Sequence, residues 1–134
     1  MKAIDGRYEG TNFEVLDVWG RIDAIKLEDV PVQHIERHVG QEERTKLIRS
    51  LMKTLGLKGI SVRKATGAQC YWTYITVPKM AYDPKVSQAE RENIWELEYK
   101  AKEKIESIIL AAFPSFEDRS DPQTDYFSFV FMVS

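Results

Sequence analysis

The feature that most constrains the fold is a change in the spacing of apolar residues along the chain. Apolar side chains recur at helical intervals over Gln41–Leu55 and again over Gln88–Ala112, and two strand-like runs lie between them over Gly59–Val77. A nearly continuous apolar run over Tyr126–Val133 is typical of a strand that is covered on at least one face. Helices and strands in this order predict an α+β protein.

The first helical segment is expected to have one apolar face and one basic face. Its leucine, isoleucine and methionine residues follow the i, i+1, i+4, i+5, i+8 spacing of a single helical face. At about 100° per residue, three cations fall together on the opposite face: Lys46, Arg49 and Lys53. Gly56 follows the last apolar residue and predicts the end of this helix.

The next two segments predict a β-hairpin. Ile60 and Val62 alternate with polar residues, including Arg63, and the run over Gln69–Val77 is rich in β-branched and aromatic side chains. The short link through Thr66-Gly67 indicates antiparallel pairing.

The long second helix is expected to begin at a capping box. Ser87 is followed three residues later by Glu90, so each side chain can satisfy a backbone N–H at the start of the helix. Pro114 marks the end of this helix.

The first 40 residues complete the predicted topology as an N-terminal β segment. Phe13, Val15 and Val18-Trp19 indicate a strand, with Gly20 as a turn. With that strand the order becomes β-α-β-β-α-β, a ferredoxin-like two-layer sandwich with an antiparallel sheet and two helices on one face. The 134 residues are then a single α+β domain.

Composition and charge narrow the classes of function. No run approaches the roughly 18 apolar residues of a membrane helix, and a single cysteine cannot form an internal disulfide, so a cytoplasmic protein is expected. The net charge of −2 conceals a middle segment, residues 37–64, with 8 basic and 2 acidic side chains. That segment suits phosphates or an acidic protein surface, and it is equally consistent with a solvated helix face.

No catalytic motif is recognisable, and no metal site or cofactor is predicted. His34 and His38 stand four apart, as zinc ligands on a helix can, but a structural site needs four ligands. Cys70 lies in a predicted strand, where a buried thiol is the simpler interpretation. An acidic group lacks the spacing and the internal glycine of a calcium loop, and it consists of Glu117, Asp118, Asp121 and Asp125.

Aromatic residues on the predicted strands offer a binding face. Strand alternation places Trp72 and Tyr74 on one side of the sheet, and it groups the last-strand residues Phe127, Phe129 and Phe131. With both helices on one side of the sheet, the other side is open, and exposed aromatic rings can stack on unpaired bases. The alternative is that these rings form the core beneath the helices.

Two short motifs resemble those of a known family. The run Ile60-Ser61-Val62-Arg63 and the later run Thr124-Asp125-Tyr126-Phe127 are similar to stretches in the large polyvalent-protein-associated domains of phage and mobile-element proteins. The resemblance covers roughly residues 42–134. It implies a setting of phage or other mobile DNA, where small proteins often counter host defence or handle nucleic acid, and it implies no defined activity.

The sequence therefore predicts a non-catalytic binding protein, and three hypotheses stand. The first is an inhibitor that docks on a host protein. The second is a nucleic-acid-binding module, and the third is a small metal- or carboxylate-dependent enzyme. A homodimer is a further expectation. In the second hypothesis the basic helix lies on the helical side of the sheet, apart from the aromatic face, and can hold a nucleic-acid backbone alone. The candidate residues for binding nucleic acid or a protein partner are Lys46, Arg49, Lys53, Arg63, Lys64, Trp72 and Tyr74.

Overall fold

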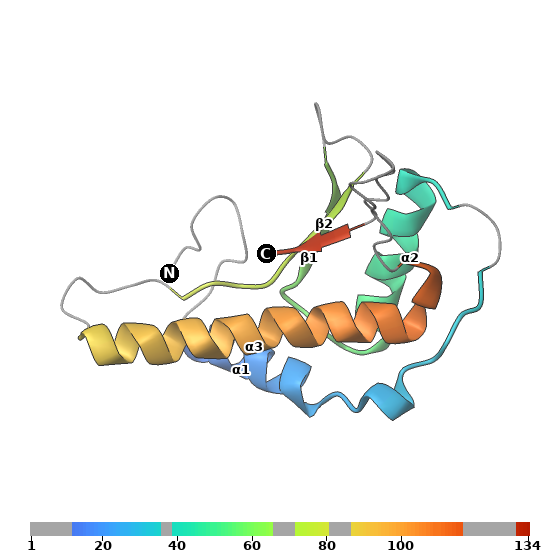
Figure 1. The fold of residues 1–134 in the computed structure, drawn as a ribbon. Coiled ribbons are helices and arrows are strands. Elements are labelled where there is room, and N and C mark those ends of the chain that lie inside the picture. Colours follow the sequence, from blue (N-terminus) through green and yellow to red (C-terminus); the bar gives the residue numbers. More distant parts are fainter. Residues whose placement is uncertain (1–11, 36–38, 66–71, 81–86, 117–130) are drawn as a thin grey trace, which may run out of the picture.

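The computed structural model of the chain describes residues 12–35, 39–65, 72–80, 87–116 and 131–134. Figure 1 shows the long helix α3 running beside a small sheet, with α1 packed against α3 and α2 next to the sheet. In chain order the elements are α1 (Asn12–Ala24), η2 (Leu27–Asp29), α2 (Gln41–Thr54), β1 (Ser61–Lys64), β2 (Thr73–Thr76), α3 (Gln88–Ala112), η4 (Pro114–Phe116) and β3 (Phe131–Val133).

Within the described residues, the sheet has three strands in the order β1-β2-β3. β1 and β2 are antiparallel with Val62 opposite Ile75, which confirms the predicted hairpin pairing. β2 and β3 are parallel with Ile75 opposite Val133. Because parallel neighbours need a crossover connection, the long α3 between β2 and β3 suits this topology.

The ferredoxin-like prediction is wrong, because the N-terminal segment is a helix and the sheet is mixed. In α1 the buried residues are Val15, Val18, Trp19 and Ile22, each no more than 6% exposed, and they recur at i, i+3, i+4, i+7. This is the spacing of one helical face, and it outweighs the short strand-like alternation of Phe13 and Val15. With no N-terminal strand in the described residues, β3 lies beside β2 and runs parallel to it.

The end of α2 is set by a glycine, as the sequence predicts. Gly56 has φ of +69°, in the left-handed region that favours glycine. Its N–H donates to the carbonyl of Lys53, and the N–H of Leu57 donates to the carbonyl of Met52. These two bonds form a Schellman motif, which satisfies carbonyls that the helix itself leaves without donors.

The core lies between the helices and one face of the sheet. Thr73 and Ile75 on that face are fully buried, and Phe131 and Val133 of β3 lie opposite them and are half-buried. Phe131 is therefore on the helix-covered side. The large apolar side chains that are essentially inaccessible come from α1, α2, β2 and α3 and the residues that follow β2 and α3: Val15, Ile22, Ile48, Ile75, Val77, Ile105, Ile108, Ile109 and Phe113.

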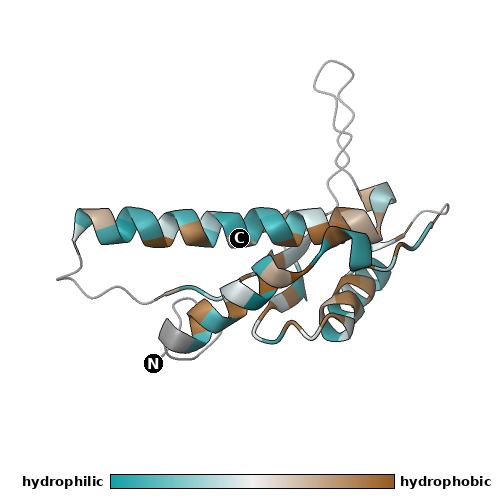
Figure 2. Ribbon diagram, turned by 90° about the horizontal axis from the view of Figure 1, so that it is seen from below, coloured by the Kyte–Doolittle hydropathy of each residue, from teal (hydrophilic) through white to brown (hydrophobic). Residues whose placement is uncertain are grey.

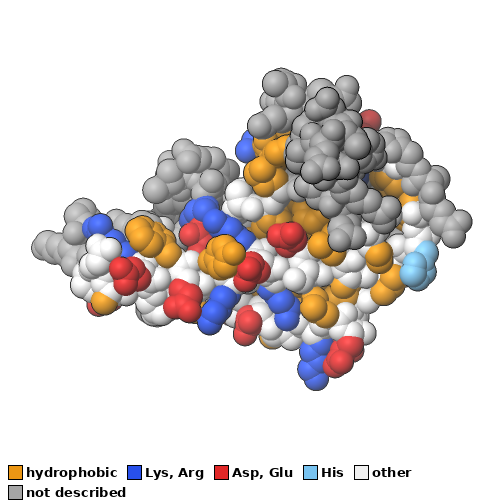
Figure 3. Space-filling model, viewed as in Figure 1, with side chains coloured by type: hydrophobic (Ala, Val, Ile, Leu, Met, Phe, Trp, Pro, Cys, Tyr) orange, Lys and Arg blue, Asp and Glu red, His pale blue; other side chains and the backbone are white. Residues whose placement is uncertain are grey.

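Helix α3 has 25 residues, and only its C-terminal half contains buried ones. Its buried residues all lie in the C-terminal half, and they are Ala101, Ile105, Ile108, Ile109 and Ala112. Figure 2 shows hydrophilic residues along most of α3. Figure 3 shows hydrophobic side chains interspersed with acidic and basic ones on the surface of the same helix. The N-terminal half of α3 therefore presents a mixed surface.

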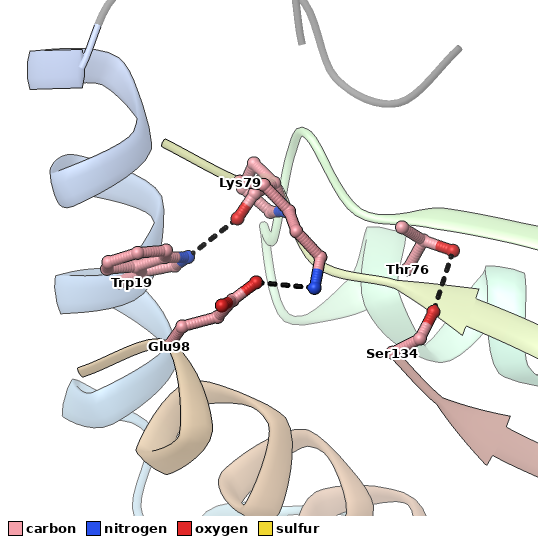
Figure 4. A network of polar contacts seen from close by, with 6 residues as sticks. Trp19, Thr76, Lys79, Glu98 and Ser134 are labelled. Carbon is pink, nitrogen blue, oxygen red and sulfur yellow. Dashed lines mark hydrogen bonds and ion pairs between the residues drawn. The ribbon is translucent and has the colours of Figure 1, made fainter. Parts of the chain in front are cut away.

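Polar contacts connect α1, the residues after β2, and α3 (Figure 4). The indole N–H of Trp19 donates to the carbonyl of Pro78 over 2.9 Å. The next residue, Lys79, forms an ion pair with Glu98 of α3, with 2.6 Å between Nζ and Oε1. Their side chains are 24% and 13% exposed, so this pair is shielded from water far more than the helix-surface pairs. The contacts fix the N-terminal half of α3 to the rest of the molecule.

Candidate binding surface on the sheet and the basic helix

A row of side chains crosses the sheet on the face that the helices do not cover. Arg63 of β1 lies opposite Tyr74 of β2, and Tyr74 lies opposite Met132 of β3. Directly opposed residues project to the same face of a sheet, and this row alternates with the row of buried Val62, buried Ile75 and half-buried Val133 on the covered face. Arg63 is exposed, Tyr74 is half-buried and Met132 is 43% exposed, so this face is open to a ligand.

Two aromatic rings on this face form a preorganised pair. The ring centroids of Trp72 and Tyr74 lie 6.1 Å apart, and their planes are nearly perpendicular at 86°. This edge-to-face geometry is favourable for aromatic side chains. The ring contact confirms the prediction that the two residues share a face. We call Trp72 and Tyr74 the aromatic pair.

A cation lies against the aromatic pair. The guanidinium carbon of Arg63 is 5.6 Å from the centroid of the Tyr74 ring, within the range of a cation–π interaction. This contact holds a positive charge next to a half-exposed ring. A planar, anionic ligand could stack on the ring and pair with the guanidinium at the same time.

One cation of the basic face of α2 reaches the edge of the sheet. Lys46, Arg49 and Lys53 are all exposed, as the helical spacing predicts. The Arg49 guanidinium donates to the carbonyl of Val62 over 2.7 Å and so reaches the edge strand β1 next to Arg63. Helix α2 itself packs on the covered face, where Thr45 bonds to Thr73, so the predicted separation of the basic helix from the aromatic face stays a prediction. We call Lys46, Arg49, Lys53, Arg63 and Lys64 the basic edge.

A buried polar cluster positions α2 against β2. The Thr73 hydroxyl shares a hydrogen bond of 2.9 Å with the Thr45 hydroxyl, and it accepts one of 3.2 Å from Nε of Arg44. Gln41 donates from its side-chain amide to the carbonyls of Ala65, over 3.1 Å, and Trp72, over 2.7 Å. The cluster therefore holds the backbone at the aromatic pair in a fixed relation to the basic helix.

Arg44 is the residue of this cluster that sequence reasoning missed. It is 5% exposed, and burial lowers the pKa of its guanidinium from the ordinary value. An arginine remains charged in proteins even so. Arg44 stands four residues before Ile48 and seven before Leu51, on the apolar face of the helix. A charged residue at a core position was the observable sign of a buried polar cluster.

The other candidate residues are not assembled into a site within the described part of the chain. His34 is exposed. His38, Cys70 and the acidic group from Glu117 to Asp125 lie outside the described residues. Among the side chains that the structure does describe, no three or more His, Cys, Asp or Glu residues are grouped to hold a metal ion. The enzyme hypothesis therefore stays a prediction.

None of the described helices is both long enough and apolar enough to cross a bilayer. α3 has sufficient length, but charged residues occur throughout its sequence.

Comparisons with protein-family models, with curated proteins and with solved structures find no match to this chain. The resemblance to the phage and mobile-element domains therefore stays a prediction.

Proposed function

We propose that the protein binds single-stranded nucleic acid on the open face of the sheet, with the phosphates lying along the basic edge. The observation that carries this proposal is the contact of Arg63 with the aromatic pair, together with the bond from Arg49 to the neighbouring residue Val62. Two aromatic rings are in contact, one guanidinium lies over the Tyr74 ring, and a second guanidinium bonds to the edge strand β1. This combination of stacking surface and cations is typical of single-strand recognition.

The aromatic pair favours a single strand over a duplex. Bases in a duplex are stacked on one another, whereas unpaired bases can stack on a protein ring, with a contribution of about 1–3 kcal/mol per base. Tyr74 is half-buried and Arg63 beside it is exposed, so part of the Tyr74 side chain is accessible from solvent. A half-buried ring loses little freedom on binding, which favours affinity.

The basic edge supplies the electrostatic part of the binding. Segment 37–64 has a net charge of +6, from 8 basic and 2 acidic residues, in a chain of net charge −2. Exposed Lys46 and Lys53 lie one helical turn on either side of Arg49 on the same face of α2. Because cations that contact phosphates release counterions, the affinity should fall steeply with added salt.

The direct test is fluorescence anisotropy with labelled DNA and RNA of roughly 16 nucleotides, single-stranded and duplex, at two salt concentrations. We expect tighter binding to the single strands. Lys46→Glu/Lys53→Glu should reduce the affinity about tenfold or more and flatten the salt dependence. Lys26→Glu/Lys100→Glu, which changes two exposed lysines elsewhere, is the matched control and should bind as the wild type does.

A second pair of variants tests the stacking. Tyr74→Ala should lose about 1–3 kcal/mol of binding free energy, whereas Tyr74→Phe, which keeps the ring, should lose little. Equal affinity for single strands and duplex, together with an unaffected Tyr74→Ala variant, would contradict stacking. An absence of binding at low salt would overturn the proposal and leave the basic edge for an acidic protein surface, in line with the docking hypothesis.

A further inference from the structure

Helix α3 carries a stripe of residues, exposed at every position but the half-buried Lys102, that the proposed nucleic-acid function does not use. Its positions alternate at spacings of four and three residues, which places them on one face of a helix. The hydrogen bond of 3.3 Å from the Gln88 amide to the Glu92 carboxylate runs along this face. We call this set the outer stripe, and it consists of Gln88, Glu92, Trp95, Tyr99, Lys102 and Glu106.

The centre of the outer stripe is aromatic and exposed. Trp95 is 51% exposed and Tyr99 is 60% exposed, and they lie one helical turn apart. Both stand in the half of α3 in which no residue is fully buried. Two large neighbouring rings that remain in water are typical of an interaction surface, since tryptophan and tyrosine are enriched where proteins meet.

The charges of the outer stripe identify the occupant. They are Glu92 on the N-terminal side of the aromatic centre, and the half-buried Lys102 followed by Glu106 on its C-terminal side. If a second α3 packs antiparallel about a two-fold axis at the level of Leu97, Trp95 of each copy meets Tyr99 of the other. In the same register Glu92 of each copy meets Lys102 of the other. The stripe is therefore complementary to itself, as a two-fold interface requires.

A parallel pairing lacks this complementarity. It would place Glu92 against Glu92 and Lys102 against Lys102, and like charges placed together across an interface are unfavourable. We propose that a second copy of this chain docks on the outer stripe, forming an antiparallel homodimer centred on Trp95 and Tyr99.

The oligomeric state of the full chain tests this inference, independently of any nucleic-acid binding. Sedimentation equilibrium over a range of concentrations should give a mass that rises from the chain mass of 15.5 kDa to twice that value. Trp95→Ala/Tyr99→Ala should remain monomeric at concentrations at which the wild type is dimeric. A wild type that is monomeric throughout a range extending to roughly millimolar would overturn the inference, because it would imply a dissociation constant weaker than biological association normally requires.

Charge exchange tests the antiparallel register. Glu92→Lys and Lys102→Glu should each weaken association about tenfold or more, because each places like charges together twice in the dimer. The double variant Glu92→Lys/Lys102→Glu should associate as tightly as the wild type. An equimolar mixture of the two single variants should also associate, which shows that both are folded.

The matched control uses a pair on the same helix but off the stripe. Glu96 and Lys100 are exposed and four residues apart, with 3.9 Å between their charged atoms. Glu96→Lys and Lys100→Glu should leave the dissociation constant unchanged. A dimer that responds to this pair, or one that does not respond to changes at Glu92 and Lys102, would overturn the proposed register and point to another surface.

Discussion

The two halves of α3 belong to one continuous helix, yet one half is part of the core and the other half is largely exposed. The C-terminal half contributes Ile105, Ile108 and Ile109 to the core, each completely buried. The N-terminal half keeps Trp95 and Tyr99 in water and contacts the body of the protein through Glu98. The apolar periodicity of the sequence therefore predicts that a helix forms. Which half of that helix is buried depends on the elements that pack against it.

The largest expected effect is a loss of stability on substitution in the buried half of α3 but not in the exposed half. Ile105→Ala should lower the free energy of unfolding by about 2–5 kcal/mol, because it leaves a cavity in a closely packed core. Trp95→Ala removes a larger side chain but should change the stability by no more than about 0.5 kcal/mol. Urea denaturation at low protein concentration, where the proposed dimer would be dissociated, measures both. Similar losses for the two variants would contradict the comparison.

The next effect concerns the shielded ion pair that fixes the N-terminal half. Glu98→Gln should lower the free energy of unfolding by about 1–3 kcal/mol, because Lys79 keeps a poorly hydrated charge without its counterion. The control is Glu96→Gln, whose pair with Lys100 has side chains 66% and 65% exposed. It should cost less than about 0.5 kcal/mol. Equal costs in denaturation would show that the Lys79–Glu98 pair is solvated.

A smaller effect is expected at the first turn of α3. The Ser87 hydroxyl accepts a hydrogen bond of 3.2 Å from the backbone N–H of Glu90, which confirms its predicted capping role. Ser87→Ala should cost about 1 kcal/mol, and Ser87→Asp should retain the cap. Hydrogen exchange of the first-turn amides is the measurement. Ser107→Ala, at an exposed position within the same helix, is the control and should leave those amides unchanged.

The smallest effect is a shift in the pKa of Tyr99, in the exposed half of α3. A hydrogen bond to Glu103, and then the negative charges of Glu103 and Glu106, raise the pKa of Tyr99 above its ordinary value. The phenolate of Tyr99 should therefore form at higher pH than that of free tyrosine, since ionisation loses the bond and adds a third negative charge. Difference absorbance titration of the wild type against Tyr99→Phe isolates this transition. Glu103→Gln should lower its midpoint more than Glu106→Gln does, and the reverse order would contradict the assignment.

Long helices were predictable from the sequence because their pattern is local and repeated. The second long segment was predicted at Gln88–Ala112 and is found there, and the first, predicted to end at Leu55, ends at Thr54. α1 was misread as a strand. Its buried residues Val15, Val18 and Ile22 follow a helical period, but the run is short and the alternation beside it suggested otherwise.

The candidate surface was predictable in part. Exposure of Lys46, Arg49 and Lys53 follows from helical geometry, and the shared face of Trp72 and Tyr74 follows from strand geometry. The bond from Arg49 to the carbonyl of Val62, which joins α2 to the edge strand, was not predictable. A side-chain bond between elements depends on their relative position, which no spacing along the chain specifies.

The sequence by itself determined where the two long helices lie, which face of α2 is basic, and that the strands after it pair as a hairpin. Only the tertiary structure decided that β3 runs parallel beside β2, that Arg44 is buried with Thr73, and that half of α3 remains in water. The physical reason is the range of the interactions. Periodicity and capping act within a few residues, whereas strand partners and burial depend on contacts between residues far apart in the chain.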